Sequence, residues 1–119
     1  MKKVNLIEKF NSFTEHWSPK IAGELNGQYV KLVRFKGPFV WHFHEQEDEF
    51  FYVVKGSFVM ELRHGNIELG EGDFLIVPKE TEHRPNAIEE AWVMLFEPAE
   101  TLNTGNTKNE FTKTELDII

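Results

Sequence analysis

Between residues 28 and 98, apolar and polar side chains alternate in short runs that Gly, Pro and charged turns separate. A period of two is typical of β-strands, because successive side chains of a strand point to opposite faces of the sheet. The pattern predicts strands over residues 28–35, 39–44, 50–54, 57–63, 67–69, 74–77 and 91–97. Short strands that recur about every 8–12 residues favour an all-β fold, either a barrel or a sandwich of antiparallel strands.

The two ends of the chain lack this alternation. Residues 3–17 carry apolar side chains at spacings that suit a short helix or a strand followed by a turn, and Ser18-Pro19 ends the segment. Residues 99–119 are mostly polar, so we expect a loop or a flexible tail in which Phe111 and residues 116–119 can dock back or cover a partner subunit. We therefore expect one domain over residues 1–119, with a barrel core of about 25–98 and a C-terminal tail of 99–119.

Composition and charge narrow the possible partners. The formal net charge is -7 and no Lys/Arg cluster stands out, which disfavours nucleic acid as a partner. The absence of cysteine excludes disulfides, thiolate metal sites and cysteine nucleophiles. The first residues lack the apolar run of a signal peptide, and no segment approaches the ~20 apolar residues of a membrane span. We expect a cytoplasmic protein without a membrane partner.

Four side chains carry the candidate chemistry. His42 and His44 are two apart in a predicted strand, so both imidazoles project from the same face. Glu49 begins the next strand, which should return antiparallel beside the first, and a barrel can bring His83 to the same mouth. Three imidazoles and one carboxylate suit a divalent transition metal such as Mn, Fe, Co, Ni or Zn, with positions left for water or substrate. The donor set does not select one of these metals.

Two stretches around these residues resemble the sequence motifs of the cupin superfamily. The run from Gly37 to Gly56 contains His-x-His followed by a Glu, and the run from Gly72 to Asn86 contains a Pro and then His83. The resemblance implies an antiparallel jelly-roll barrel, commonly dimeric, with His42, His44, Glu49 and His83 as metal ligands. The chain resembles small stand-alone bacterial cupins more closely, and these are often labelled by analogy with mannose-6-phosphate isomerases. We give that label little weight, because fold does not determine function.

The chain departs from the family pattern at one informative position. Glu80 stands where the family usually has Gly, which implies a turn that avoids the positive φ that Gly allows. Asp48 competes with Glu49 as the carboxylate ligand, and the family spacing to Gly56 favours Glu49. Of the remaining histidines, His64 lies in a turn and is expected at the surface, and His16 is expected to pack or cap.

Aromatic residues suggest how the barrel is covered. Alternation places Val40, Phe51 and Val53 on the inward face with the ligands, and places Trp41, Phe43, Phe50 and Tyr52 on the opposite face. Contiguous aromatic side chains of this kind mark interfaces, so we predict a homodimer in which these residues pack against a second sheet or a second subunit. The phenylalanines at positions 50, 51, 58, 74 and 96 are expected to be mostly core.

Two classes of function are compatible with this site. The first is a metalloenzyme that acts on a small organic molecule, by dioxygenation or by isomerisation, with Glu49 doubling as a proton acceptor if it leaves the metal. No other general base is evident from the sequence. The second is a metal-dependent module that binds or senses a small molecule without turnover.

Overall fold

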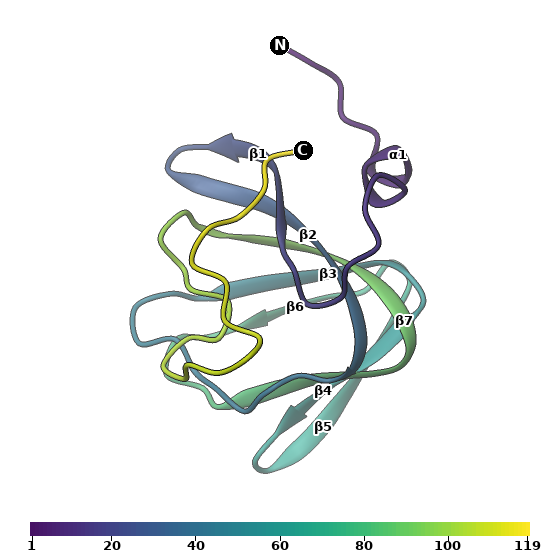
Figure 1. The fold of residues 1–119 in the computed structure, drawn as a ribbon. Coiled ribbons are helices and arrows are strands. Elements are labelled where there is room, and N and C mark those ends of the chain that lie inside the picture. The colour runs from purple at the N-terminus through teal and green to yellow at the C-terminus, as the bar shows by residue number, and fades with distance from the viewer.

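The structure is a computed structural model that describes residues 1–119 (Figure 1). One short helix, α1 (Leu6–Phe10), precedes seven strands, and this helix is too short to cross a membrane. The strands are β1 (Lys20–Leu25), β2 (Gln28–Pro38), β3 (Glu49–Lys55), β4 (Ser57–Leu62), β5 (Gly65–Gly70), β6 (Phe74–Val77) and β7 (His83–Pro98). Every pairing between them is antiparallel, which confirms the predicted all-β, jelly-roll class.

Strand β7 organises the barrel because it is the longest strand, with 16 residues, and pairs with three others. One edge follows β2 from Gln28↔Pro98 to Pro38↔Asn86. The other edge pairs first with β4 and then with β3. Irregular registers in β2 and β3 mark bulges, which increase the twist of a strand. Because β7 pairs with other strands along both of its edges, the sheet curls around a common interior. Every second side chain of each strand points into this interior.

The interior is filled by the inward-facing positions of these strands. Its buried residues include Val33, Phe35, Phe51, Val53, Phe58, Met60, Val93 and Leu95. A smaller cluster lies on the outer face of β2, where Phe10 of α1 stacks on Trp92 with ring centroids 4.9 Å apart. Asn5 caps this helix by accepting a hydrogen bond of 3.0 Å from the Glu8 backbone N–H. The apolar residues near the N-terminus therefore form a helix that covers the barrel.

Several details differ from the sequence prediction, including β1, which no predicted strand covers. Residues 39–44 are not a regular strand, because their only β-pairing is an isolated bridge between His42 and His83. The last strand begins at His83 rather than near residue 91. Phe74 is 60% exposed, because its position on β6 faces away from the interior and leaves its ring against Phe50.

The C-terminal residues dock back onto the barrel, as one of the two expected alternatives proposed. Residues 101–112, which we call the C-terminal strap, cross the barrel in Figure 1 as a yellow segment. Thr101 and Thr104 are buried, and Phe111 packs on Phe39 with ring centroids 5.4 Å apart. Beyond the strap, the backbone N–H of Ile119 donates to the Ile21 carbonyl at 3.0 Å. Most of this segment has no regular secondary structure, yet it is held by specific contacts.

Candidate metal centre

The four predicted ligand residues come together at one end of the barrel. His42 and His44 lie on the segment between β2 and β3, whereas Glu49 and His83 are the first residues of β3 and β7. Each can offer one ligand atom such that all four atoms lie within 4.8 Å of one another. None of the four residues is more than 4% exposed. The cluster therefore has the composition and compactness needed to hold a metal ion.

Backbone pairing sets the relative positions of the histidines. The N–H of His42 donates to the His83 carbonyl at 3.1 Å, and the N–H of His83 donates back at 2.9 Å. This bridge places the two residues directly opposite each other, and their ring centroids are 4.2 Å apart. The His44 carbonyl accepts a hydrogen bond of 2.7 Å from the Glu80 N–H. Two short backbone links therefore join the segment before β3 to the loop before β7.

The turn at Glu80 contradicts the sequence prediction. Glu80 has φ of 68°, so it adopts the left-handed conformation that the prediction excluded. This conformation usually favours Gly and costs about 1–2 kcal/mol for a residue with a Cβ. The Glu80 N–H donates to the His44 carbonyl, which ties this strained turn to the segment that carries the histidines. Glu80 therefore adopts the conformation that Gly would favour, at a cost in backbone strain.

The outer nitrogens of two rings identify the tautomers at the site. His42 Nδ1 lies 2.8 Å from the Val40 carbonyl, and His83 Nδ1 lies 2.8 Å from the Thr81 carbonyl. A carbonyl oxygen can only accept, so each Nδ1 carries the hydrogen and each Nε2 of the neutral ring carries a lone pair. The same local contact, to a carbonyl two residues earlier, orients both rings. Such contacts are typical of metal-binding histidines.

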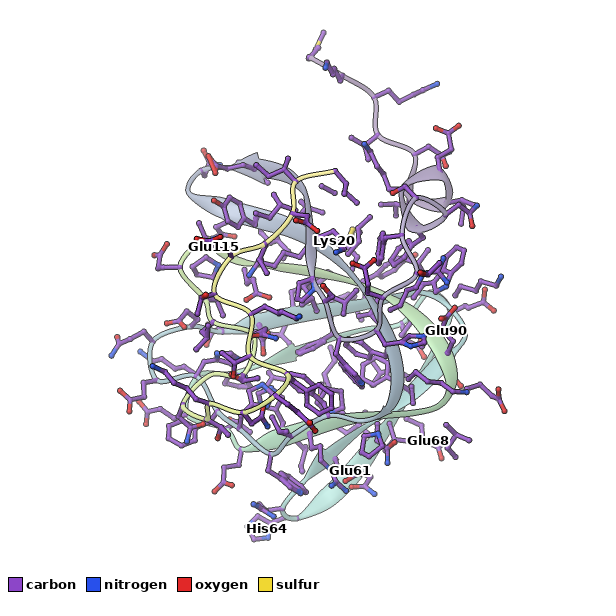
Figure 2. The ribbon with its side chains drawn as sticks, in the orientation of Figure 1. Lys20, Glu61, His64, Glu68, Glu90 and Glu115 are labelled. Carbon is purple, nitrogen blue, oxygen red and sulfur yellow. The ribbon has the colours of Figure 1, made fainter.

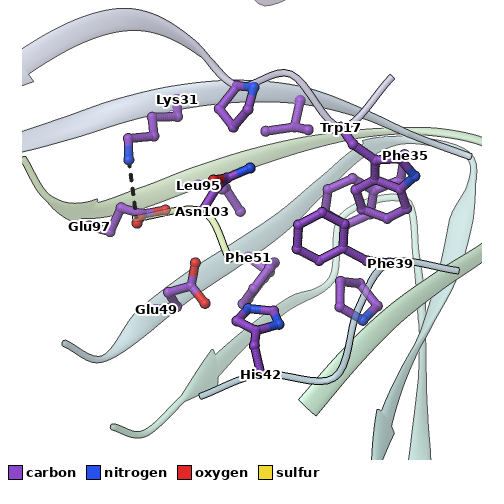
Figure 3. Close-up of a pocket in the computed structure, with 13 residues that line it drawn as sticks. Trp17, Lys31, Phe35, Phe39, His42, Glu49, Phe51, Leu95, Glu97 and Asn103 are labelled. Carbon is purple, nitrogen blue, oxygen red and sulfur yellow. Dashed lines mark ion pairs between the residues drawn. The ribbon is translucent and has the colours of Figure 1, made fainter. Parts of the chain in front are cut away.

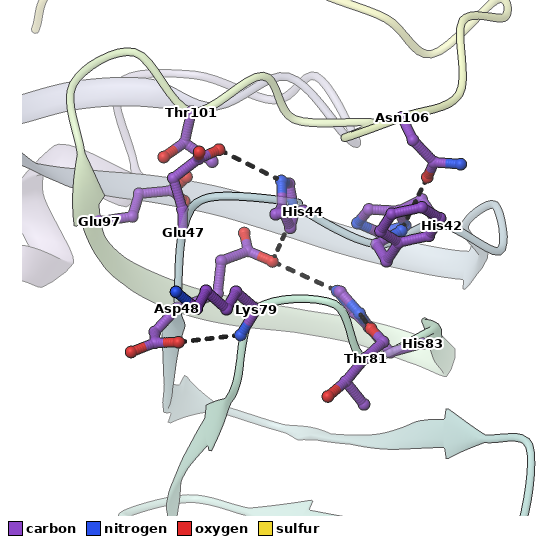
Figure 4. Close-up of polar contacts among 12 residues, drawn as sticks. His42, His44, Glu47, Asp48, Lys79, Thr81, His83, Glu97, Thr101 and Asn106 are labelled. Carbon is purple, nitrogen blue, oxygen red and sulfur yellow. Dashed lines mark hydrogen bonds and ion pairs between the residues drawn. The ribbon is translucent and has the colours of Figure 1, made fainter.

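Glu49 lies among these lone pairs. Its Oε1 atom is 2.9 Å from His44 Nε2 and 3.2 Å from His83 Nε2. Figure 4 shows how His42, His44 and His83 lie around this position. In the neutral form of His83 with its hydrogen on Nδ1, the Nε2 lone pair would face a carboxylate oxygen, an arrangement that a cation bound by both atoms stabilises. The buried ring nitrogens of His44 make no well-directed hydrogen bond. A cation between these atoms would satisfy both observations, so the residues fit a divalent metal.

Burial and charge set the protonation of the cluster. Burial lowers the pKa of His42 to about 4, and a positive charge on His83 would lower it further. Burial would raise the pKa of Glu49, but its interactions with the His44 and His83 imidazoles hold that pKa well below its usual range. Burial would lower the pKa of His44, yet the Glu49 carboxylate outweighs it and raises that pKa. At neutral pH Glu49 is therefore ionised and His42 neutral, the forms that bind metals.

Other candidates from the sequence lie outside the cluster. Asp48 accepts a hydrogen bond of 2.8 Å from the Lys79 backbone N–H, so its carboxylate serves the loop, and Glu49 occupies the cluster instead. His64 is exposed at the turn between β4 and β5, as predicted, and Figure 2 labels it at the lower end of the view. His16, expected to pack or cap, instead forms a half-exposed pair with Glu90, with 2.6 Å between Nε2 and the carboxylate.

The sequence analysis missed a buried pair beside the cluster. Lys31 of β2 and Glu97 of β7 are 1% and 2% exposed, and both line a cavity of about 30 Å³ with His42 and Glu49. Burial raises the pKa of Glu97, the nearby Glu49 carboxylate raises it further, and Lys31 opposes them. A second carboxyl therefore lies beside the cluster, at a position that the sequence pattern did not single out.

Comparison with known proteins establishes the family. The cupin domain model matches residues 32–97, which run from β2 to β7 and include all four candidate ligand residues. The uncharacterised protein YdbB of Bacillus subtilis (strain 168) is 32% identical over 84 residues, covering 70% of this chain and 74% of that protein. This chain belongs to the cupin family, as the fold and the motifs around the cluster indicate.

Solved structures support the same assignment. A cupin-2 domain containing protein from Shewanella frigidimarina NCIMB 400 has a TM-score of 0.79 and 42% identity, covering 80% of this chain and 93% of that chain. Hydroquinone 1,2-dioxygenase from Sphingomonas sp. TTNP3 with 4-hydroxybenzoate bound has a TM-score of 0.73 and 13% identity, covering 80% of this chain and 31% of the dioxygenase. The second likeness concerns the fold alone.

Proposed function

We propose that this cupin is a metal-dependent enzyme acting on a small organic molecule, with His42, His44, Glu49 and His83 as its metal ligands. The observation that carries this proposal is the gathering of four buried side chains, each of which offers one ligand atom, with all four atoms within 4.8 Å of one another. A cation among these atoms would compensate the buried Glu49 carboxylate and accept the lone pairs of the imidazoles. Three imidazoles and a carboxylate suit a divalent transition metal.

The residues around the cluster define what each group would do. A bound metal would supply Lewis acidity, and O₂ binding as well if it is iron. His42, His44 and His83 would hold it from fixed ring orientations. Glu49 would act as a fourth ligand and as a proton acceptor when it releases the metal. The apolar side of the cavity, formed by Trp17, Phe35 and Phe39, would exclude water from the reacting molecule. Dioxygenation and isomerisation both remain compatible with this set.

A second candidate is a metal-dependent binding module without turnover. The observation that favours it is the small volume of the cavity, about 30 Å³, beneath a strap that is held by backbone contacts. Oxygen uptake and product analysis with catechols, thiols and keto acids separate the two functions. Tight binding of a ligand without turnover of any compound in the panel would favour the module.

Metal binding tests the proposal directly. Elemental analysis of protein purified without chelators, followed by calorimetric titration of metal-free protein with Mn²⁺, Fe²⁺, Co²⁺, Ni²⁺ and Zn²⁺, should show one bound ion per chain. His83→Ala should weaken the affinity more than roughly 100-fold, because removing a group that only orients a ligand already costs about 10–100-fold. His64→Ala is the matched control at an exposed histidine. Equal affinities for the two variants would refute the ligand assignment.

We also propose that the chain forms a homodimer through the outer face of β3 and β6. Phe74 and Ile76 are 60% and 54% exposed there, and Phe74 stacks on Phe50. Adjacent exposed apolar side chains are costly in water, and they mark interfaces. Sedimentation of the wild-type chain as a monomer at micromolar concentration would contradict this arrangement.

A further inference from the structure

The cavity beside the metal cluster has two chemically different sides. Figure 3 shows Trp17, Phe35 and Phe39 on one side, and Lys31, Glu97 and Glu49 on the other. Lys31 contributes the only Lys or Arg side chain to the lining. A Lys side chain is almost never fully buried unless it is paired, yet Lys31 is 1% exposed. The burial of this ammonium group at the cavity wall therefore requires an explanation.

The protein satisfies the Lys31 ammonium group incompletely. Its Nζ donates to the Thr101 carbonyl at 3.3 Å and lies 3.5 Å from Glu97 Oε2. Charge-assisted hydrogen bonds are usually about 2.7–2.9 Å, and an ammonium group has three hydrogens to donate. Glu97 Oε2 itself makes no hydrogen bond. A purely structural ion pair in so dry a place would be expected to close to a shorter distance.

We propose that Lys31 anchors the substrate in this cavity by binding the carboxylate of a small organic acid. This inference rests on the proposed function, because the same acid would place a second oxygen on the metal. The carboxylate would complete the donor requirement of Nζ that Thr101 and Glu97 leave open. The aromatic side would contact the carbon skeleton.

The chemistry of the wall favours a carboxylate over a phosphoryl group. A phosphoryl group presents three oxygens and up to two negative charges, and sites for it usually supply several cationic or backbone donors. One ammonium group in a cavity of about 30 Å³ matches a single carboxylate on a molecule of few atoms. The backbone carbonyl of Thr101 holds Nζ from the side of the strap, so the position of Lys31 depends on the strap remaining docked.

Paired acids and amides test the anchor. Glycolate, lactate, pyruvate and salicylate are titrated calorimetrically into the full chain, each beside its neutral amide. We expect at least one acid to bind about 10-fold or more tighter than its amide, the range of one charged hydrogen bond. Lys31→Met should abolish this preference, and Lys31→Arg should retain part of it. Lys36→Met is the matched control, since Lys36 lies on the same strand with a half-exposed side chain 3.8 Å from Glu89.

The outcomes separate the anchor from the metal proposal. The titrations are made with and without added metal, and metal affinity is measured for every variant. Loss of the acid preference in Lys31→Met, with metal affinity unchanged, supports the anchor. If metal fails to bind the wild-type chain while the acid preference persists, the proposed function fails and the anchor stands. Equal binding of acids and amides to the wild-type chain, no binding of any acid, or a preference that survives in Lys31→Met overturns the anchor. The wild-type comparison decides even if Lys31→Met does not fold.

Discussion

The contact between the strap and the segment that carries His42 and His44 predicts a costly substitution at Gly105. A Cβ atom added there would lie 2.3 Å from the Phe43 carbonyl oxygen and 3.1 Å from His42 Cδ2. Both neighbours belong to the segment that carries the histidines, and the first is backbone that cannot rotate away. Gly105→Ala should therefore displace the strap from the mouth of the barrel.

The magnitude follows from the interactions that the displacement breaks. Gly105 has φ of +56°, a conformation that costs a residue with a Cβ about 1 kcal/mol or more. Lifting the strap also breaks the pair of hydrogen bonds that join Asn106 to the Phe43 backbone, at 3.0 Å and 2.8 Å. Each contributes about 1 kcal/mol net. The free energy of unfolding should fall by about 3 kcal/mol in total.

Gly27 provides a control for the backbone term alone. Its φ is +76°, but a Cβ atom there would meet no other atom within 4 Å. Gly27→Ala should therefore cost only about 1 kcal/mol. The difference of about 2 kcal/mol corresponds to a shift of the urea midpoint by about 1 M at the usual slope for small proteins. Equal destabilisation of the two variants would refute the close packing of the strap against the histidine segment.

Two further predictions concern the loop at Glu80 and the apo cluster. Glu80→Gly should raise the free energy of unfolding by up to about 1 kcal/mol, because it relieves the backbone strain at φ 68°. The control variant Lys79→Gly should give no such gain. A loss of stability in Glu80→Gly would contradict the strain. In urea titrations of chelator-treated protein, stability should fall by about 3 kcal/mol from pH 6.5 to 4, because folded His42, with a pKa of about 4, resists the protonation that the unfolded chain accepts at 6.5. The raised pKa of His44 contributes stability that is complete below pH 6.5 and is lost as the pH rises through the pKa of the folded state. Together, His42 and His44 place the maximum of the free energy of unfolding near pH 6.5. A free energy of unfolding that does not change with pH would contradict both assignments.

Sequence patterns predicted most strands because alternation reports which side chains are buried, and the sheet buries one face. The strand prediction was wrong over residues 39–44. His42 and His44 do project to the same side, but they do so from an extended segment that a single β-bridge joins to the barrel. Pattern alone cannot distinguish a paired strand from an extended segment whose side chains face one cluster. The prediction for the Glu80 turn was wrong for a different reason: a family preference for Gly identifies the residue of lowest energy at a positive φ, but it does not prevent another residue from adopting that conformation at a cost in strain.

The strap carries no pattern because its backbone makes most of the contacts that hold it. Asn106 N–H donates to the Phe43 carbonyl, and the Thr101 carbonyl accepts from Lys31. Such contacts depend on the path of the chain more than on residue type. The sequence of a polar segment of this kind therefore predicts a flexible tail even where the backbone is docked.

Lys31 and Glu97, in contrast, did leave a signal in the sequence. Lys31 is in phase with Val33 and Phe35 along β2, and Glu97 is in phase with Val93 and Leu95 along β7. The register pairs Tyr29 with Glu97 and Lys31 with Leu95, so Lys31 and Glu97 are diagonal neighbours on the inward face. A single charged residue in phase with core residues is compatible with a long side chain near the end of a strand, whose aliphatic stem is buried while its charged group reaches water. Opposite charges in phase on two strands that pair with each other indicate a buried polar site, and here that site adjoins the metal cluster.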